Sequence, residues 1–260
     1  MESQPPPTMV FFDLDNTLFN HKHSLYSAIS AVQRISPLLH EIPLKVLAEK
    51  YNEALNHVYD KYLRNEVAHE DQDAEKVKLF FKSLDLEEPD SQQIEHFRNV
   101  YKMAYRKNRS AMPGSIQTLR GLRDNGYRTA IITNGPTESQ IEKAKAIGVF
   151  DLVERVITSQ EVGHPKPEVR IFQYALEKLE VQPHCAYMIG DSVEDDIKGA
   201  VNAKITPILY SPSSNTSLEV LCGKTIPAIR QFDQLPMALE LRPLDLSLAV
   251  SAAQTGLQPA

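Results

Sequence analysis

The spacing of hydrophobic positions changes twice along the chain and divides it into three parts. A short apolar run at 9–12 leads directly into Asp13, which is typical of a buried strand that ends at a loop. Beyond Leu18, apolar residues recur three and four positions apart, with no strand pattern up to about residue 110. After residue 112, short apolar runs alternate with helical patterns. The sequence therefore predicts one strand, then a group of helices, then alternating strands and helices.

The middle part has four apolar stripes at helical spacing, which predict four helices. Pro43 stands near the start of the second stripe, and Asp90 or Ser91 is a suitable N-cap for the fourth. We interpret the aromatic residues in these stripes as the core of an all-helical segment. The stripes lie within 25–32, 44–62, 77–84 and 94–104.

The last part predicts a sheet built from repeated strand–helix units. Because strands alternate with helices, we expect a parallel, doubly wound sheet that binds ligands beyond the carboxyl ends of its strands. A final strand and helix are expected from Thr225 to about Leu241. The other expected strands are 128–133, 153–158, 186–190 and 205–210, and the expected helices are 115–125, 137–147, 168–180 and 193–203.

The predicted fold class is α/β, a Rossmann-like doubly wound parallel sheet core with an inserted all-helical domain. The core is expected to comprise 8–18 and 111–241, and the helical domain 19–110. Residues 1–7 and 242–260 are expected to be flexible tails, because they are polar or lack a regular apolar pattern.

Composition narrows the classes of partner and location. The chain has 260 residues, 42% of them hydrophobic, which is enough for one sizeable core with a large insertion. The net charge is −6 with no basic stripe, so we expect neither nucleic acid nor membrane as a partner. Cys185 and Cys222 are far apart and indicate a reducing compartment, the cytoplasm or alternatively the nucleus. No apolar run approaches transmembrane length, and the oligomeric state is left open.

Asp13 and Asp15 stand one residue apart at the end of the first predicted strand. Burying an unpaired carboxylate is costly, so two of them at a strand end favour a chemical role. One carboxylate can attack an electrophile or hold a metal, and the other can give and take a proton. The alternative is that 15–17 form an ordinary turn held by the Asp15 side chain.

Further polar residues follow the strands at the same predicted edge. Thr133 and Asn134 end one strand, Lys166 precedes a helix, and Asp191 ends another strand. Taken singly, these positions suit a turn, a solvated lysine and a helix N-cap. Taken together, carboxylates, a hydroxyl, main-chain N–H groups and a lysine suit a bound phosphate and Mg²⁺.

Four motifs in order give the chain a resemblance to the haloacid dehalogenase-like (HAD) hydrolase superfamily. They are Asp-x-Asp-x-Thr at 13–17, Thr-Asn-Gly at 133–135, Lys-Pro at 166–167 and Gly-Asp at 190–191 followed by the acids at 195–196. The resemblance covers roughly 8–240. The helical segment lies between the first and second motifs, where subfamily I members carry a helical C1 cap.

The resemblance implies a role for each motif residue. Asp13 would be the nucleophile that forms an aspartyl-phosphate, and Asp15 would protonate the leaving oxygen and then activate water. Mg²⁺ would be held by the Asp13 carboxylate, the Asp15 main-chain carbonyl and Asp191. The phosphoryl group would be bound by Thr133, the Asn134 main chain and Lys166. Asp195 or Asp196 would support Lys166 or metal-bound water, and Asp196 is favoured because Ile197-x-Gly199-Ala200 follows it.

These roles imply a Mg²⁺-dependent phosphatase, a phosphoric monoester hydrolase acting on a small phosphorylated metabolite. The leaving group could be of nucleotide, sugar, glycolate or isoprenoid type. Asp15 favours phosphate chemistry over dehalogenation, because a halide leaves without a proton. A hexose phosphomutase and a non-catalytic HAD-fold binding or regulatory protein are the alternatives. His21 and His23 follow the first motif and either contact substrate or form a solvated turn.

Overall fold

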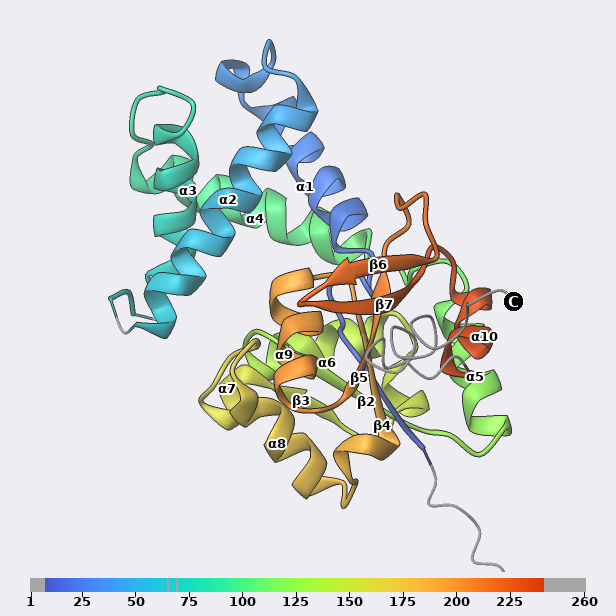
Figure 1. Cartoon of the computed structure of the whole chain (residues 1–260). Coiled ribbons are helices and arrows are strands. Elements are labelled where there is room, and N and C mark those ends of the chain that lie inside the picture. The colour runs from blue at the N-terminus through green and yellow to red at the C-terminus, as the bar shows by residue number, and fades with distance from the viewer. Residues whose placement is uncertain (1–7, 65, 69, 241–260) are drawn as a thin grey trace, which may run out of the picture. The chain divides into compact units, whose positions relative to one another are not determined.

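The computed structural model describes residues 8–64, 66–68 and 70–240, which form two compact units (Figure 1). One unit runs up to Phe19 and resumes at Ala111, and the other spans Asn20–Ser110. The predicted tails at 1–7 and 242–260 lie outside the described residues.

The first unit is built on a seven-stranded sheet with the order β3-β2-β1-β4-β5-β7-β6. All neighbouring strands are parallel except β6 and β7, which pair antiparallel. The predicted α/β class is therefore confirmed, with one antiparallel edge strand added. The strands are β1 (Met9–Phe12), β2 (Arg128–Thr133), β3 (Val156–Thr158), β4 (Ala186–Gly190), β5 (Thr206–Tyr210), β6 (Leu218–Leu221) and β7 (Lys224–Ile229).

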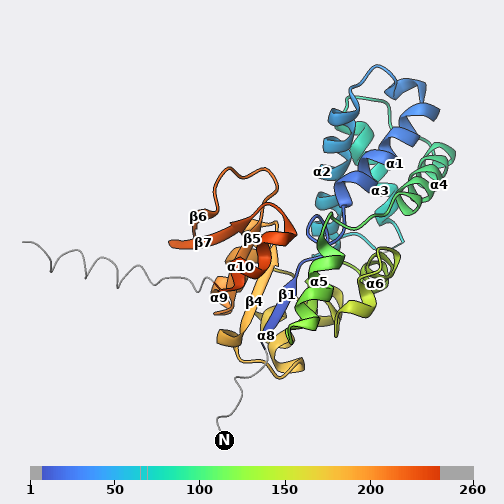
Figure 2. The ribbon, with the colours of Figure 1, turned by 90° about the vertical axis from the view of Figure 1, so that its right-hand side faces the viewer.

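Strand β6 was not predicted, and its place at the sheet edge explains why (Figure 2). It pairs with β7 alone, and its Leu218 and Val220 are exposed, so it lacks the continuous buried run of the inner strands. Its hairpin turns at Cys222 and Gly223, both with positive φ (52° and 70°). Two such residues are typical of a tight hairpin turn, but cysteine is not the residue that usually signals one.

Helices and helical turns cover the two faces of the sheet. Met9 and Phe11 pack with α8 residues such as Phe172 on one face, and Phe12 points to the other, with its ring 6.5 Å from that of Phe232. The α-helices of this unit are α5 (Ser115–Asp124), α6 (Thr137–Ala146), α7 (Ser159–Val162), α8 (Val169–Lys178), α9 (Gly199–Asn202) and α10 (Leu235–Glu240). The 3₁₀ turns are η2 (Phe150–Leu152), η3 (Pro183–Cys185) and η5 (Phe232–Gln234).

The expected single helix at 193–203 is instead a π-helical segment, η4 (Val193–Lys198), followed by α9. The Ser192 carbonyl accepts hydrogen bonds from the main-chain N–H groups of both Asp196 and Ile197, at 3.0 and 3.2 Å. This wider first turn directs Asp196 inward beneath β4, where it is 1% exposed. Such π-helical insertions are often found at functional sites.

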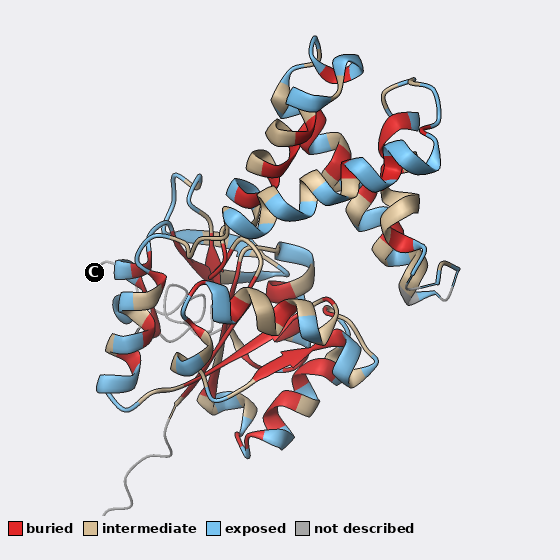
Figure 3. Cartoon of the chain, turned by 180° about the vertical axis from the view of Figure 1, so that it is seen from behind, coloured by how far each residue is buried: buried red, intermediate tan, exposed pale blue. Residues whose placement is uncertain are grey.

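The second unit is all helical, with α1 (His21–Ile35), η1 (Pro37–Leu39), α2 (Leu44–Leu63), α3 (Gln72–Lys82) and α4 (Ser91–Lys107). Its core contains the predicted aromatic side chains, and the ring of Tyr51 lies 5.4 Å from those of both Phe80 and Phe97. Of the two expected N-cap residues of α4, it is Asp90 that caps the helix, and it exchanges hydrogen bonds with Gln93 in a capping box. Figure 3 shows the buried residues of both units. Within the described residues, no helix has the length and apolar character that a membrane span requires.

Candidate active site

Asp13 lies where β1 leaves the sheet. Its main-chain N–H donates to the Ile189 carbonyl of β4 at 2.8 Å. The hydrogen bonds between β1 and β4 therefore continue as far as Asp13 and fix the position of its backbone. The chain then turns at Asn16, which has a φ of 63°, and Leu18 and Phe19 both donate back to the Leu14 carbonyl. The side chain of Asp13 is held in the interior and is 6% exposed as a residue.

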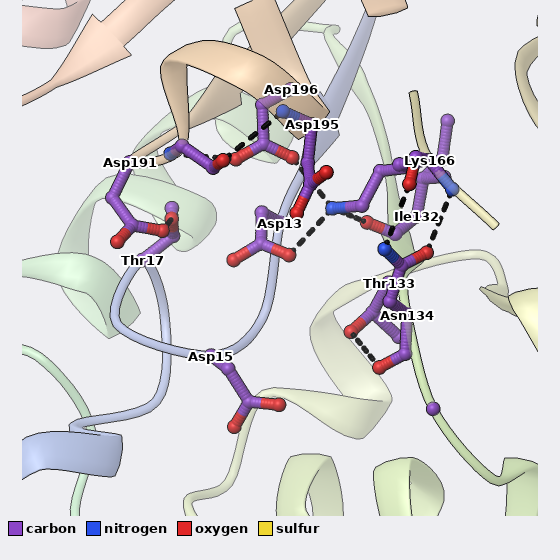
Figure 4. A network of polar contacts seen from close by, with 12 residues as sticks. Asp13, Asp15, Thr17, Ile132, Thr133, Asn134, Lys166, Asp191, Asp195 and Asp196 are labelled. Atoms are coloured by element: carbon purple, nitrogen blue, oxygen red, sulfur yellow. Dashed lines mark hydrogen bonds and ion pairs between the residues drawn. The ribbon is translucent and has the colours of Figure 1, made fainter. Parts of the chain in front are cut away.

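Lys166 reaches Asp13 from the loop before α8. Its Nζ lies 2.7 Å from Asp13 Oδ1, 2.6 Å from Asp196 Oδ1 and 2.9 Å from the Ile132 carbonyl, as Figure 4 shows. These three acceptors match the three protons of an ammonium group. The Asn134 side chain accepts from the Lys166 main-chain N–H at 2.8 Å and donates to its carbonyl at 3.1 Å. Asn134 therefore positions the lysine through its backbone.

The electrostatics of this cluster follow from burying three charges together. Burial alone would lower the pKa of Lys166, but Asp13 and Asp196 outweigh it and raise the pKa above its usual range. Lys166 is therefore protonated. Burial raises the pKa of Asp13 well above its usual value, against the opposing effect of Lys166, and the nearby Asp196 and Asp191 raise it further. Burial and the neighbouring Asp196 likewise raise the pKa of Asp191 to about 6.

The excess of carboxylates over cations here is suited to a hard metal ion. One oxygen each from Asp13, Asp191 and Asp196 lie within 4.8 Å of one another. Oxygens on opposite sides of one Mg²⁺ are about 4.2 Å apart, so small side-chain movements would let these residues share an ion. Asp196 already accepts from Lys166 and from the Ser192 main-chain N–H, the latter at 3.0 Å. The more available carboxylates are those of Asp13 and Asp191, and Thr17 donates to Asp191 at 3.3 Å.

Gly190 makes this arrangement possible. A Cβ at this position would lie 2.5 Å from the Cβ of Asp196 and closer still to its carboxylate carbon and Oδ2. No side chain larger than hydrogen can occupy that space unless Asp196 moves. In the Gly-Asp pair at 190–191, the glycine leaves room for Asp196, and Asp191 adds its carboxylate to the cluster formed with Asp13 and Asp196.

The comparisons with known proteins agree with this geometry. A family model described as haloacid dehalogenase-like hydrolase matches residues 7–204. The chain belongs to this family. The resemblance drawn from the four motifs is therefore confirmed.

Relatives of this HAD-like hydrolase carry phosphatase names. A ribulose-1,5-bisphosphate 5-phosphatase from Halopiger xanaduensis is 30% identical over 212 residues, covering 80% of this chain and 87% of the relative. A glyceraldehyde 3-phosphate phosphatase from Pyrococcus furiosus is 30% identical over 216 residues, covering 82% and 84%. The predicted class, a phosphoric monoester hydrolase, agrees with these names. The fold is also that of the HAD-hydrolase YfnB from Bacillus subtilis, with a TM-score of 0.68, 18% identity and coverage of 91% and 100%.

The structure brings most of the predicted site residues of this hydrolase together. Asp13, Lys166, Asp191 and Asp196 form one cluster, with Thr133 buried at the end of β2 beside it. Of the two candidate acids after Asp191, it is Asp196 that contacts Lys166, whereas Asp195 donates its main-chain N–H to the Ser192 hydroxyl at 3.0 Å.

The remaining predicted residues lie elsewhere. The Asp15 carboxylate is not part of the cluster of possible metal ligands. Metal binding by the main-chain carbonyl of Asp15 stays a prediction. His21 and His23 belong to the helical unit. His21 Nδ1 lies 2.7 Å from the Tyr105 hydroxyl, and the His23 main-chain N–H donates to Asn20 at the start of α1. Their contact with substrate stays a prediction.

Sequence reasoning missed two residues of α6, Gln140 and Lys143. Both contact the Asp15 carboxylate, Lys143 at 2.7 Å to each oxygen and Gln140 at 3.1 Å to Oδ2. Gln140 was the more detectable, because it is a polar residue on the apolar face of α6, four positions before the buried Ala144. No local pattern marks Lys143, which is 128 positions from its partner.

Proposed function

We propose that this HAD-like hydrolase is a Mg²⁺-dependent phosphatase that hydrolyses the phosphomonoester of a small metabolite through an aspartyl-phosphate on Asp13. The observation that carries the proposal is the buried contact of 2.7 Å between Asp13 and Lys166 at the carboxyl end of β1, with Asp191 in the same cluster. A carboxylate that could act as the nucleophile, a buried cation and oxygens that could bind a metal therefore lie close together.

The proposed reaction has two phosphoryl transfers. In the first, Asp13 attacks phosphorus, the ester P–O bond breaks and the leaving oxygen takes a proton from Asp15. In the second, water attacks the phosphorus of the aspartyl-phosphate and gives a proton to Asp15, so that Asp13 is released. Lys166, the Thr133 hydroxyl and the Asn134 main-chain N–H would hold the phosphoryl oxygens throughout and offset their charge.

The metal would be held by the carboxylates of Asp13 and Asp191 and by the predicted Asp15 carbonyl. When bound, Mg²⁺ would supply positive charge that reduces the repulsion between the attacking carboxylate and the anionic phosphoryl group. The raised pKa values of Asp13 and Asp191 support this proposal, because they reflect carboxylates that are buried and that lie near one another without enough positive charge.

The substrate is proposed to be a small sugar phosphate in the first instance. Two relatives that align over 80% and 82% of the chain are named for ribulose bisphosphate and glyceraldehyde 3-phosphate, both phosphates of short sugars. Nucleotide, glycolate and isoprenoid phosphates are the other classes to be tested. A phosphomutase would use the same Asp13, Asp15 and Lys166, so product analysis has to separate the two reactions.

The test is a phosphate-release screen with purified protein and Mg²⁺ across these four classes of ester. Asp13→Asn, which keeps the shape of the side chain but not its nucleophilic charge, is the matched control. We expect one preferred class, with release abolished in Asp13→Asn. If phosphate appears on another hydroxyl of a sugar substrate rather than in solution, the protein is a mutase. If the folded protein releases phosphate from no ester, the proposal is wrong.

A further inference from the structure

The carboxylate of Asp15 is held by two side chains of α6. Lys143 Nζ lies 2.7 Å from both Oδ1 and Oδ2, and Gln140 Nε2 lies 3.1 Å from Oδ2. Figure 4 shows the Asp15 side chain standing apart from the cluster of Asp13, Lys166 and Asp196. Lys143 and Gln140 therefore contact Asp15, whereas Lys166 contacts the nucleophile Asp13.

Gln140 ties Asp15 to the phosphoryl-binding segment. Its Nε2 also lies 3.2 Å from Thr133 Oγ1 and 2.5 Å from the Asn134 carbonyl. Because two of these neighbours are a carboxylate and a carbonyl, the amide nitrogen rather than the amide oxygen must face them. Gln140 is 2% exposed, so this placement is fixed by packing.

Gly135 provides the room for Gln140. A Cβ at Gly135 would lie 2.7 Å from Gln140 Nε2, and the φ of 131° at this residue is one that other residues rarely adopt. The position of the Gln140 side chain therefore depends on a glycine at position 135.

Lys143 also contacts a second residue of the loop that carries Asp15, Phe19. Its Nζ lies 5.5 Å from the ring centroid of Phe19, within the range of a cation–π contact. The main-chain N–H of Asn16 donates to the Phe19 carbonyl at 2.7 Å, which closes the loop that carries Asp15. With its side chain 12% exposed, Lys143 is mostly withdrawn from water. Lys143 therefore contacts both the carboxylate of Asp15 and the ring of Phe19 on the same loop.

We propose that Lys143 and Gln140 are positioning residues that hold the Asp15 carboxyl group for proton transfer to the leaving oxygen, and that Lys143 stabilises the carboxylate that Asp15 becomes as this proton leaves. The inference rests on the proposed function, in which the ester oxygen leaves with the proton of Asp15 and the hydrolytic water restores it. Lys143 and Gln140 make no bond to phosphorus and exchange no proton themselves. Their loss therefore impairs the step that needs Asp15 and spares a reaction that does not.

Leaving-group dependence tests this directly. An alkyl phosphate needs a proton on its leaving oxygen, whereas p-nitrophenyl phosphate releases a stable phenolate that does not. We compare kcat/KM, because it reports the steps up to release of the alcohol or phenol. For Lys143→Met we expect kcat/KM to fall about 10- to 100-fold with the alkyl phosphate, part of what general acid catalysis contributes. With p-nitrophenyl phosphate we expect a change of less than about 3-fold on the same reasoning.

Matched variants separate positioning from charge and from folding. Lys145→Met removes another lysine of the same helix, one that is exposed and whose Nζ lies over the Phe150 ring at 5.0 Å, and should leave both reactions unchanged. Lys143→Arg should recover part of the alkyl phosphate activity, because it can still donate to both oxygens of Asp15. Gln140→Leu also loses the contacts to Thr133 and Asn134, so it should lower kcat/KM with both esters, and more strongly with the alkyl phosphate. If Lys143→Met does not fold, Lys143→Gln, which keeps a donor without the charge, takes its place.

Each outcome decides between the proposals. A selective loss with alkyl phosphates supports the positioning role. An equal loss with both esters would mean that Lys143 binds the phosphoryl group or maintains the fold, and unchanged or faster turnover would mean that it does not assist Asp15. Either result overturns the inference while the phosphatase proposal stands. A wild-type protein that cleaves neither ester overturns both.

Discussion

Replacing Gly190 by alanine should destabilise the protein and disable the site, because the space for a methyl group is occupied by Asp196. The added Cβ would lie 2.5 Å from the Cβ of Asp196, against about 3.8 Å for ordinary carbon contact. Forced overpacking of this kind costs about 1–3 kcal/mol. Relief by moving Asp196 would lengthen its contacts to Lys166 (2.6 Å) and to the Ser192 N–H (3.0 Å). Charged hydrogen bonds contribute about 1.5–3 kcal/mol each. We therefore expect a loss of about 3 kcal/mol in the free energy of unfolding.

The assay is denaturant unfolding followed by far-UV circular dichroism, since the chain contains no Trp for fluorescence. Gly121→Ala is the matched control, because Gly121 lies inside α5 with nothing within 4 Å of a Cβ there. Alanine should raise the stability at that position by up to about 1 kcal/mol, through helix propensity alone. If Gly190→Ala costs less than about 1 kcal/mol on the same scale, the close approach of Asp196 to β4 is wrong.

Three further predictions follow from the charges. Lys166→Met should lower kcat by about 1,000-fold or more, since it removes the buried cation beside Asp13. Steady-state kinetics on the folded variant measure this, and turnover close to that of the wild type would contradict it. EDTA should abolish phosphate release and added Mg²⁺ should restore it; turnover that EDTA leaves intact would contradict the role given to Asp191. Burial alone would raise the pKa of Asp73, but Lys102, Lys76 and Arg98 lower it to about 2. Asp73 should therefore stabilise the protein by about 1 kcal/mol above pH 4 and lose this as the pH falls toward 2, after allowance for solvent screening. The free energies of unfolding of the wild type and of Asp73→Asn, measured between pH 6 and pH 2.5, test this. A stability difference between the two proteins that grows as the pH falls would contradict the prediction.

The inner strands were predictable because parallel strands buried on both faces form continuous apolar runs. Strands β2 and β4 begin and end where the sequence predicted. The strand expected at 153–158 is shorter, because only Val156–Thr158 pairs with β2. The edge strand β6 and the π-helical turn η4 were missed. Both depend on contacts with neighbouring segments rather than on the period of their own residues.

The site shows the same division. Asp13 and Asp191 stand at strand ends and Lys166 stands in the loop before α8, each within a recognisable motif, so their meeting at one edge of the sheet could be anticipated. The contact of Lys143 with Asp15 joins residues 128 positions apart, and the spacing of apolar residues in α6 does not predict it. Its neighbour Lys145, equally ordinary in sequence, is exposed. Only the rotation of α6 about its axis, set by burial of Gln140 and Ala144, decides which lysine reaches the carboxylate.

The central claim is that Asp13 carries the phosphoryl group, and the most direct measurement is capture of that intermediate. Protein mixed with its preferred ester and Mg²⁺ is quenched rapidly and treated with borohydride, which reduces an aspartyl-phosphate to homoserine. Peptide mass spectrometry then locates the change. We expect homoserine at position 13 in the wild type and none in Asp13→Asn. Homoserine at another aspartate, or full turnover by Asp13→Asn, would contradict the account.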